Sequence, residues 1–155
     1  MNIEALYISP GHNYFGRHGQ APGDHPLLAV PAVECLAGRG LVGDRFLDYK
    51  DDYAGQITFF AGEVYDEIRR ALKQPDRPAA VFRRNVLTRG VDLNALIGRE
   101  FEVQGVRFAG TRECSPCYWM DQAFAPGAEA WLKGRGGLRA RILSSGRLKV
   151  DLPPC

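Results

Sequence analysis

The sequence has no long hydrophobic run, no low-complexity tract and no strong net charge. No apolar stretch in its 155 residues approaches the roughly 18 that a membrane span requires, which argues against a membrane protein. Residues 1–7 lack the basic start and apolar stretch of a secretory signal. We therefore expect a cytoplasmic protein with reduced thiols, since disulfides are rare in that compartment.

The net charge of +2 excludes little, but the charges are unevenly distributed. Residues 83–147 hold eleven Lys and Arg against six Asp and Glu, and nearly all the basic residues there are arginines. These arginines are dispersed and lack interleaved aromatics, so we expect no nucleic-acid partner. Arginine suits bidentate recognition of phosphate or carboxylate, which favours a small anionic ligand.

Glycine and proline are abundant, at eighteen and ten residues. Their number indicates many turns between short elements, which favours a β-rich domain over a helical bundle. The length is enough for one domain, residues 1–155, with a substantial core. We expect a mostly β, mainly antiparallel architecture without βαβ alternation, and a barrel rather than an open sheet because closure removes exposed edges.

Local patterns place the elements of this fold. Strands are predicted at residues 2–9, 27–36, 56–60, 81–88, 101–103, 106–108, 138–143 and 148–150. Pro31 makes residues 27–36 either an edge strand or two short strands. Gln104-Gly105 is a two-residue hairpin turn, and residues 144–146 are expected to join the last two strands into another hairpin. Helices are predicted at residues 62–73, from their apolar periodicity, and at 127–133.

Two of the four cysteines form a C-x-x-C motif, Cys114-Ser115-Pro116-Cys117. A thiolate can be a nucleophile, a sulfur carrier or a soft-metal ligand, so we expect the chemistry here. Pro116 holds Cys117 on a rigid, extended backbone. Arg112, with Arg83 or Arg84 if the fold brings them near, would stabilise a thiolate or bind an anionic cofactor.

Other uses of the pair fit less well. A structural zinc site needs two more ligands. The candidates, none suitably spaced, are Cys35, Cys155, His12, His18 and His25. The histidines lie in a predicted loop, residues 11–26, and are expected at the surface. A thioredoxin-like redox pair needs a βαβ context, whereas this pair follows a hairpin. The structural alternative is that both cysteines are small, buried side chains that fill space in the core and carry no chemistry.

Five segments, in this order, resemble the MOSC domain, the C-terminal domain of molybdenum cofactor sulfurases that also occurs alone in bacteria. They are residues 40–46, which match G-x-x-G-D-R-[HF], 82–86 with 90–93, 96–101, 135–140 and 146–148. The usual G-D near the C-terminus is replaced by Lys149-Val150-Asp151. The resemblance implies a β-rich barrel in a stand-alone MOSC protein.

The resemblance also implies a site. In amidoxime-reducing members, a cysteine matching Cys117 ligates the molybdenum of the molybdenum cofactor (molybdopterin), so Cys117 is the expected metal ligand and catalytic thiol. Arg83, Asn85 and Arg112 would contact the cofactor, with Arg45, Thr88 and Arg135 as further candidates.

Three functions remain open. The first is a molybdenum-cofactor oxidoreductase that reduces small N-hydroxylated compounds with electrons from a separate reductase. The second is a sulfur carrier on which Cys117 accepts persulfide sulfur from a pyridoxal-phosphate cysteine desulfurase. The chain carries no pyridoxal-phosphate, ferredoxin or flavin module, so we expect no bound pyridoxal phosphate. The third is a non-catalytic module that binds an anion or a protein.

Overall fold

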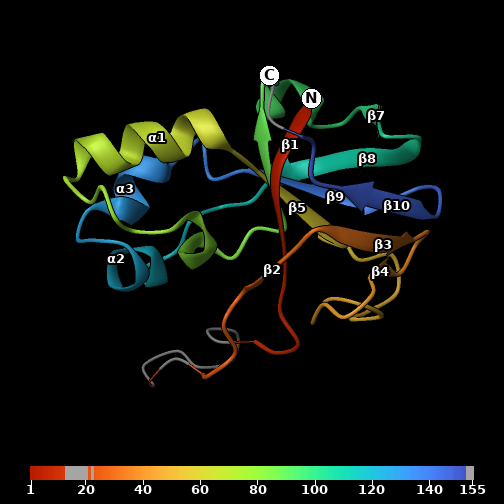
Figure 1. The fold of residues 1–155 in the computed structure, drawn as a ribbon, viewed down its shortest axis with the longest axis horizontal. Helices are drawn as coiled ribbons and strands as arrows, with labels where there is room; N and C mark the ends of the chain where they lie inside the picture. Colours follow the sequence, from red (N-terminus) through yellow and green to blue (C-terminus); the bar gives the residue numbers. More distant parts are fainter. Residues whose placement is uncertain (13–20, 22, 153–155) are drawn as a thin grey trace.

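Two open β-sheets form the centre of the molecule in this computed structural model, which describes residues 1–12, 21 and 23–152 (Figure 1). The larger sheet has the order β2-β1-β6-β5-β9-β8-β7. Its strands are β1 (Asn2–Ile8), β2 (Leu28–Val30), β5 (Ile57–Ala61), β6 (Val86–Arg89), β7 (Glu100–Val103), β8 (Val106–Glu113) and β9 (Leu138–Ile142). The smaller sheet has the order β10-β3-β4, with β3 (Ala32–Leu36), β4 (Gly40–Leu41) and β10 (Gly146–Lys149).

The mostly β, mainly antiparallel prediction is confirmed. Among the described residues, however, no strand pairing closes either sheet into a barrel. Among the pairs of strands named above, the pair β5–β6 is parallel, and the chain crosses from one strand to the other through α1 (Gly62–Ala71) and the 3-10 helix η1 (Ala79–Phe82). The expectation of no βαβ unit was therefore wrong at this point, because a parallel neighbour requires a crossover connection.

Several predicted elements are confirmed. Residues 27–36 form two short strands separated by Pro31, as one of the two interpretations expected. β7 and β8 pair as a hairpin, and Gln104 and Gly105 at its turn both have positive φ, 51° and 82°, as a type I′ turn requires. The predicted helices occur as α1 and α3 (Ala128–Leu132), whereas α2 (Trp119–Ala123) and the 3-10 helix η2 (Leu93–Leu96) were missed.

The predicted strand over residues 81–88 was wrong in its first half. Strand β6 begins only at Val86, because Val81 and Phe82 belong to η1 and Arg83 is left-handed, with φ of 59°. Phe82 is buried against Phe60 and Phe124, which stabilises this turn of helix. The left-handed residue then redirects the chain into the sheet.

The predicted last hairpin was also wrong. Strand β9 pairs with β5 and β8 in the larger sheet, whereas β10 pairs with β3 in the smaller one. The serines between them bond outward to two different elements: Ser144 Oγ accepts a hydrogen bond from Arg107 N, and Ser145 Oγ accepts one from Ala37 N. Residues 144–145 therefore link the sheets instead of turning one strand back on the other.

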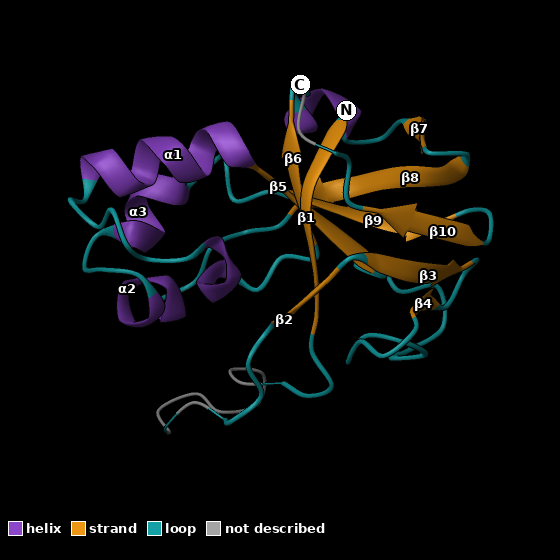
Figure 2. Ribbon diagram, in the orientation of Figure 1, coloured by secondary structure: helices purple, strands orange, loops and turns teal. Residues whose placement is uncertain are grey.

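The apolar side chains form two clusters. One includes Ile3, Phe59 and Phe108 and lies among the strands, and the other includes Phe60, Phe82 and Leu132 and lies under the helices. Figure 2 shows α1, α2 and α3 together on one side of the strands. None of the helices among the described residues is long and apolar enough to cross a membrane.

Candidate active site

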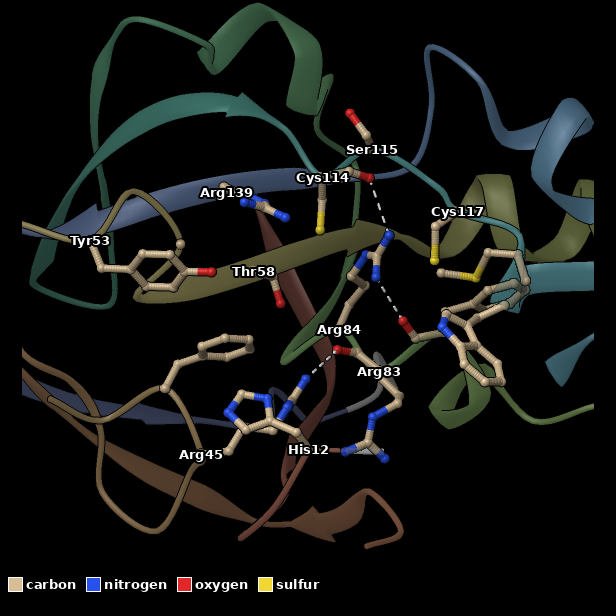
Figure 3. Close-up of a pocket in the computed structure, with 15 residues that line it drawn as sticks. His12, Arg45, Tyr53, Thr58, Arg83, Arg84, Cys114, Ser115, Cys117 and Arg139 are labelled. Carbon is tan, nitrogen blue, oxygen red and sulfur yellow. Dashed lines mark hydrogen bonds between the residues drawn. The ribbon is translucent and has the colours of Figure 1, made fainter. Parts of the chain in front are cut away.

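A cavity of about 240 Å³ lies where β5 and β9 meet the loops before β5 and β6 and the segment that leads from the end of β8 into α2 (Figure 3). Four arginines line it: Arg45, Arg83, Arg84 and Arg139. Two cysteines, Cys114 and Cys117, and apolar side chains complete its wall. Of the described residues that line the cavity, none is Asp or Glu. The site is therefore strongly cationic and suited to an anion.

The two cysteines occupy different positions in this cavity. The chain leaves β8 at Glu113, and Cys114 N donates a hydrogen bond of 2.8 Å to Gly137 O, which holds Cys114 against the start of β9. Cys114 is buried and Cys117 is exposed. Cys117 O accepts a hydrogen bond of 2.9 Å from Met120 N at the start of α2. Cys117 therefore presents its thiol at the cavity mouth, while Cys114 belongs to the inner wall.

Gly136 allows this arrangement. A Cβ at Gly136 would lie 2.3 Å from Cys114 O, a distance at which the backbone must move. The segment before β9 can therefore approach the cysteine segment closely only because residue 136 has no side chain.

Arg45 is held by the carboxylate before it. Arg45 Nη1 lies 3.1 Å from Asp44 Oδ1, and the two side chains are 8% and 0% exposed. Arg45 Nη2 also donates to Arg83 O at 3.3 Å. Burial lowers the pKa of Arg45, whereas the Asp44 charge acts in the opposite direction. Asp44 therefore offsets part of the positive charge at this end of the cavity.

Arg83 and Arg84 bond to the backbone. Arg83 donates to His25 O at 2.6 Å, to Gly11 O at 2.9 Å and to Ser9 Oγ at 3.1 Å. Arg84 donates to Phe82 O, Gly136 O and Cys114 O at 2.8, 3.0 and 3.1 Å. Carbonyl oxygens accept these hydrogen bonds without carrying a formal charge, so the bonds orient both guanidinium groups beside the cavity.

His12 differs from its predicted surface position. It is half-buried, lines the cavity and meets Phe46 edge to face at 5.0 Å. Burial, reinforced by Arg45, lowers the pKa of His12, which favours its neutral form. His25 is exposed, as expected. His18 and Cys155, two of the zinc candidates, lie outside the described residues.

A family model described as the MOSC domain matches residues 41–153, most of the chain. The chain belongs to the MOSC domain family. This confirms the resemblance drawn from the sequence motifs. The comparison with curated proteins found no match.

Solved structures share the fold of this MOSC domain. The YUAD protein from Bacillus subtilis is 19% identical with a TM-score of 0.73, over 96% of this chain and 90% of that one. YiiM from Escherichia coli is 17% identical with a TM-score of 0.68, over 97% of this chain and 67% of that one. YiiM from Geobacillus stearothermophilus is 15% identical with a TM-score of 0.68, over 98% and 72%.

The structure brings some of the predicted MOSC site residues together and leaves others apart. Cys117, Arg45 and Arg83 line the cavity. Asn85 lies beneath it, where its Oδ1 accepts hydrogen bonds from Thr58 N and Thr58 Oγ1, both at 3.0 Å. Asn85 Nδ2 donates to Tyr7 O at 3.1 Å. Asn85 therefore supports Thr58, which lines the cavity.

The remaining predicted contacts lie outside this lining. Thr88 is fully buried and donates to Phe60 O at 3.3 Å. Arg112 is exposed on β8. Arg135 stacks on Trp131, with 3.6 Å between its guanidinium carbon and the ring centroid, and lines a separate, more apolar cavity of about 400 Å³. Their roles toward a cofactor stay predictions.

Sequence reasoning missed Arg139 and Tyr53 as cavity residues. Arg139 could have been found, because β9 alternates buried apolar residues with half-buried arginines, which marks a second face of the strand. Tyr53 lies in a loop, and no pattern in the sequence indicates where its side chain points. Within the described ranges, no group of three His, Cys, Asp or Glu is placed to hold a metal ion, so the zinc alternative gains no support.

Proposed function

We propose that this MOSC domain binds the molybdenum cofactor, with the Cys117 thiolate as protein ligand to the metal and the cavity arginines beside the pterin phosphate. The observation that carries the proposal is the pairing of an exposed thiol with a cavity lined by four arginines and, among described residues, by no acidic side chain. A soft thiolate suits a soft metal centre, and guanidinium groups suit a phosphate.

The residues present fit such a group. The cofactor carries an anionic phosphate, and the positive charge around the cavity offsets the cost of removing that phosphate from water. Cys117 is exposed, so a metal centre could approach it from outside. When bound, the cofactor would supply two-electron oxygen-atom chemistry at the metal.

The reaction we propose is the reduction of small N-hydroxylated compounds. Two electrons and two protons convert the N–OH group to N–H, and the oxygen leaves as water. A separate reductase would supply the electrons. We propose that the protein acts in the cytoplasm, where Cys117 stays a free thiol.

The test is cofactor content. The chain is expressed in cells that make the cofactor and in cells that cannot, and bound molybdenum and pterin are measured. We expect both in the competent cells, loss of molybdenum in Cys117→Ala, and full content in the matched rim variant Ser115→Ala. Wild-type protein without cofactor from competent cells, and without uptake on reconstitution, would overturn the proposal.

A second candidate is a sulfur carrier, which the exposure of Cys117 favours because a desulfurase must reach the accepting sulfur. The Cys117 thiolate would attack the outer sulfur of the desulfurase persulfide and keep that sulfur, and the desulfurase cysteine would leave as a thiolate. No external oxidant is needed.

Mass spectrometry separates this candidate from the first. After incubation with a pyridoxal-phosphate cysteine desulfurase and cysteine, the mass of one sulfur atom should appear on the Cys117 peptide. Equal labelling of Cys117→Ser would exclude the carrier function. Intact ligand binding and cellular phenotype in Cys117→Ala would favour a non-catalytic binding module over both.

A further inference from the structure

Arg139 differs from the other three arginines of the cavity. Its guanidinium makes no hydrogen bond or ion pair with any residue in the part of the chain that the structure describes. Arg45 is paired with Asp44, and Arg83 and Arg84 donate to backbone carbonyls. Arg139 is half-buried on β9, where it pairs in register with Thr58 of β5. The guanidinium of Arg139 is therefore a cation whose N–H donors bond to none of the described residues and can bind a ligand.

Tyr53 supplies a second group to the same space. Figure 3 shows the Tyr53 hydroxyl and the Arg139 guanidinium pointing into the cavity, beside Thr58 and Cys114. The Tyr53 hydroxyl has no hydrogen-bond partner among the described residues. Burial raises the pKa of the Tyr53 phenol, so the hydroxyl remains a donor at neutral pH, although the Arg139 charge partly opposes the shift.

The stems of the two side chains are held by packing. A Cβ at Gly55 would lie 3.3 Å from the Tyr53 ring and 3.4 Å from Arg139 Cδ, so both side chains pass over this glycine. The Tyr53 ring also stacks on Phe46, with 5.4 Å between ring centroids and 27° between planes. The two donors are therefore presented from a fixed wall.

We propose that Arg139 and Tyr53 form an oxyanion-binding end of the cavity, which selects a small ligand with a carboxylate or phosphate and an apolar body. Guanidinium donors bind both oxyanions strongly, and the Tyr53 hydroxyl adds a neutral hydrogen bond. Phe82, Trp119 and Met120 provide the apolar part of the lining. The inference deepens the proposed function, because it names the ligand class of that site, but its binding test needs no cofactor.

The first arm of the test uses cofactor-free protein, with benzoate and phenyl phosphate as anionic probes and benzamide as the neutral control. Binding is measured by calorimetry. We expect the anions to bind at least tenfold more tightly than benzamide. Arg139→Gln should weaken anion binding about tenfold or more, because it removes the charge and the charge-assisted hydrogen bonds to the oxyanion. Arg139→Lys should restore part of the affinity.

Two further variants keep the test decisive. Tyr53→Phe removes the hydroxyl and keeps the ring, so it should weaken anion binding by a smaller factor without unfolding the protein. Arg141→Gln is the matched control, because Arg141 lies on the same strand but forms an ion pair of 2.8 Å with Asp52 and does not line the cavity. Equal binding of benzoate and benzamide, no benzoate binding at all, or wild-type anion affinity in Arg139→Gln would overturn the proposal.

The second arm identifies the source of the oxyanion. Arg139→Gln is expressed in cofactor-competent cells and its molybdenum and pterin are measured. If the variant keeps its molybdenum and pterin but no longer binds benzoate, the site binds the carboxylate of a substrate. If the variant loses both the cofactor and benzoate binding, the site binds the phosphate of the cofactor. If wild-type protein from competent cells holds no cofactor and takes none up on reconstitution, but still prefers benzoate through Arg139, the proposed function fails and this inference stands.

Discussion

Arg84 donates a hydrogen bond of 3.1 Å to the backbone carbonyl of Cys114, the inner cysteine of the site. The same guanidinium donates to Gly136 O at 3.0 Å, on the segment that runs against the cysteine segment. One side chain from the loop before β6 thus bonds to both segments that form this wall of the cavity. Arg84 serves the site first by holding its shape.

Replacing Arg84 should therefore destabilise the fold. Arg84→Ala removes three hydrogen bonds from a charged donor to partly buried carbonyls, and we expect a loss of about 2–4 kcal/mol in the free energy of unfolding. Urea denaturation measures it. Arg112→Ala, an exposed arginine on β8, is the control and should stay within about 0.5 kcal/mol of wild type. A similar small effect for both variants would contradict the structural role of Arg84.

Asn85→Ala should destabilise the cavity floor. The substitution leaves the buried Thr58 N without its acceptor, and we expect a loss of about 1–3 kcal/mol. Asn94→Ala, an exposed asparagine that bonds to Gly134 O, should lose less than about 1 kcal/mol. Thermal unfolding compares the two. If Asn94→Ala proves the more damaging, the role assigned to Asn85 is wrong.

The three described cysteines should react with thiol reagents in a fixed order. Cys117 is exposed, whereas Cys114 and Cys35 are buried, so Cys117 should be labelled first in the native protein. A Cys155→Ser background removes the terminal thiol from the measurement. Peptide mass spectrometry after brief exposure to iodoacetamide gives the order, and Cys117→Ser should abolish the fast phase. Rapid labelling of Cys35 in folded protein would be inconsistent with its burial.

Cys35 also gives a pH-dependent stability. Burial raises the pKa of its thiol to about 12, above the ordinary value of 9.0. The folded protein holds the thiol proton more tightly than the unfolded chain does. The contribution of Cys35 to the free energy of unfolding is therefore fully present below about pH 9 and is lost as the pH rises toward 12.

Wild type should therefore lose stability more steeply between about pH 9 and 11 than Cys35→Ala does. Urea denaturation at a series of pH values measures the difference. Tyr7 and Tyr53, whose pKa values are also raised by burial, are present in both proteins and cancel in the comparison. Parallel pH profiles would show that the Cys35 thiol does not contribute.

The sequence predicted those elements whose conformation depends mainly on residues close together in the chain. The β7–β8 turn was predictable because only two residues, one of them Gly105, separate two strand-like segments, and α1 because its apolar face recurs every three or four residues. The left-handed Arg83 and the late start of β6 were not, because that conformation depends on hydrogen bonds to distant carbonyls at Gly11 and His25.

At the site, too, features that depend on contacts between distant parts of the chain could not be predicted from the sequence. The motif around Cys117 and the arginines at 45 and 83 was visible in the sequence, since each lies in a segment of recognisable pattern. The inner position of Cys114 and the place of Arg139 at the cavity depend on how β8 and β9 pair, which no local pattern specifies. Arg135, predicted from its motif, instead stacks on Trp131 beside a different cavity.

The cavity wall is assembled from segments spread along most of the chain, from His12 to Arg139. Short fragments cannot form it, so a ligand that enters binds only the folded state. Binding must then raise the melting temperature in proportion to the logarithm of ligand concentration. A thermal-shift screen of anions would therefore rank candidate ligands before any reaction is known, from the melting temperature of the wild-type protein alone.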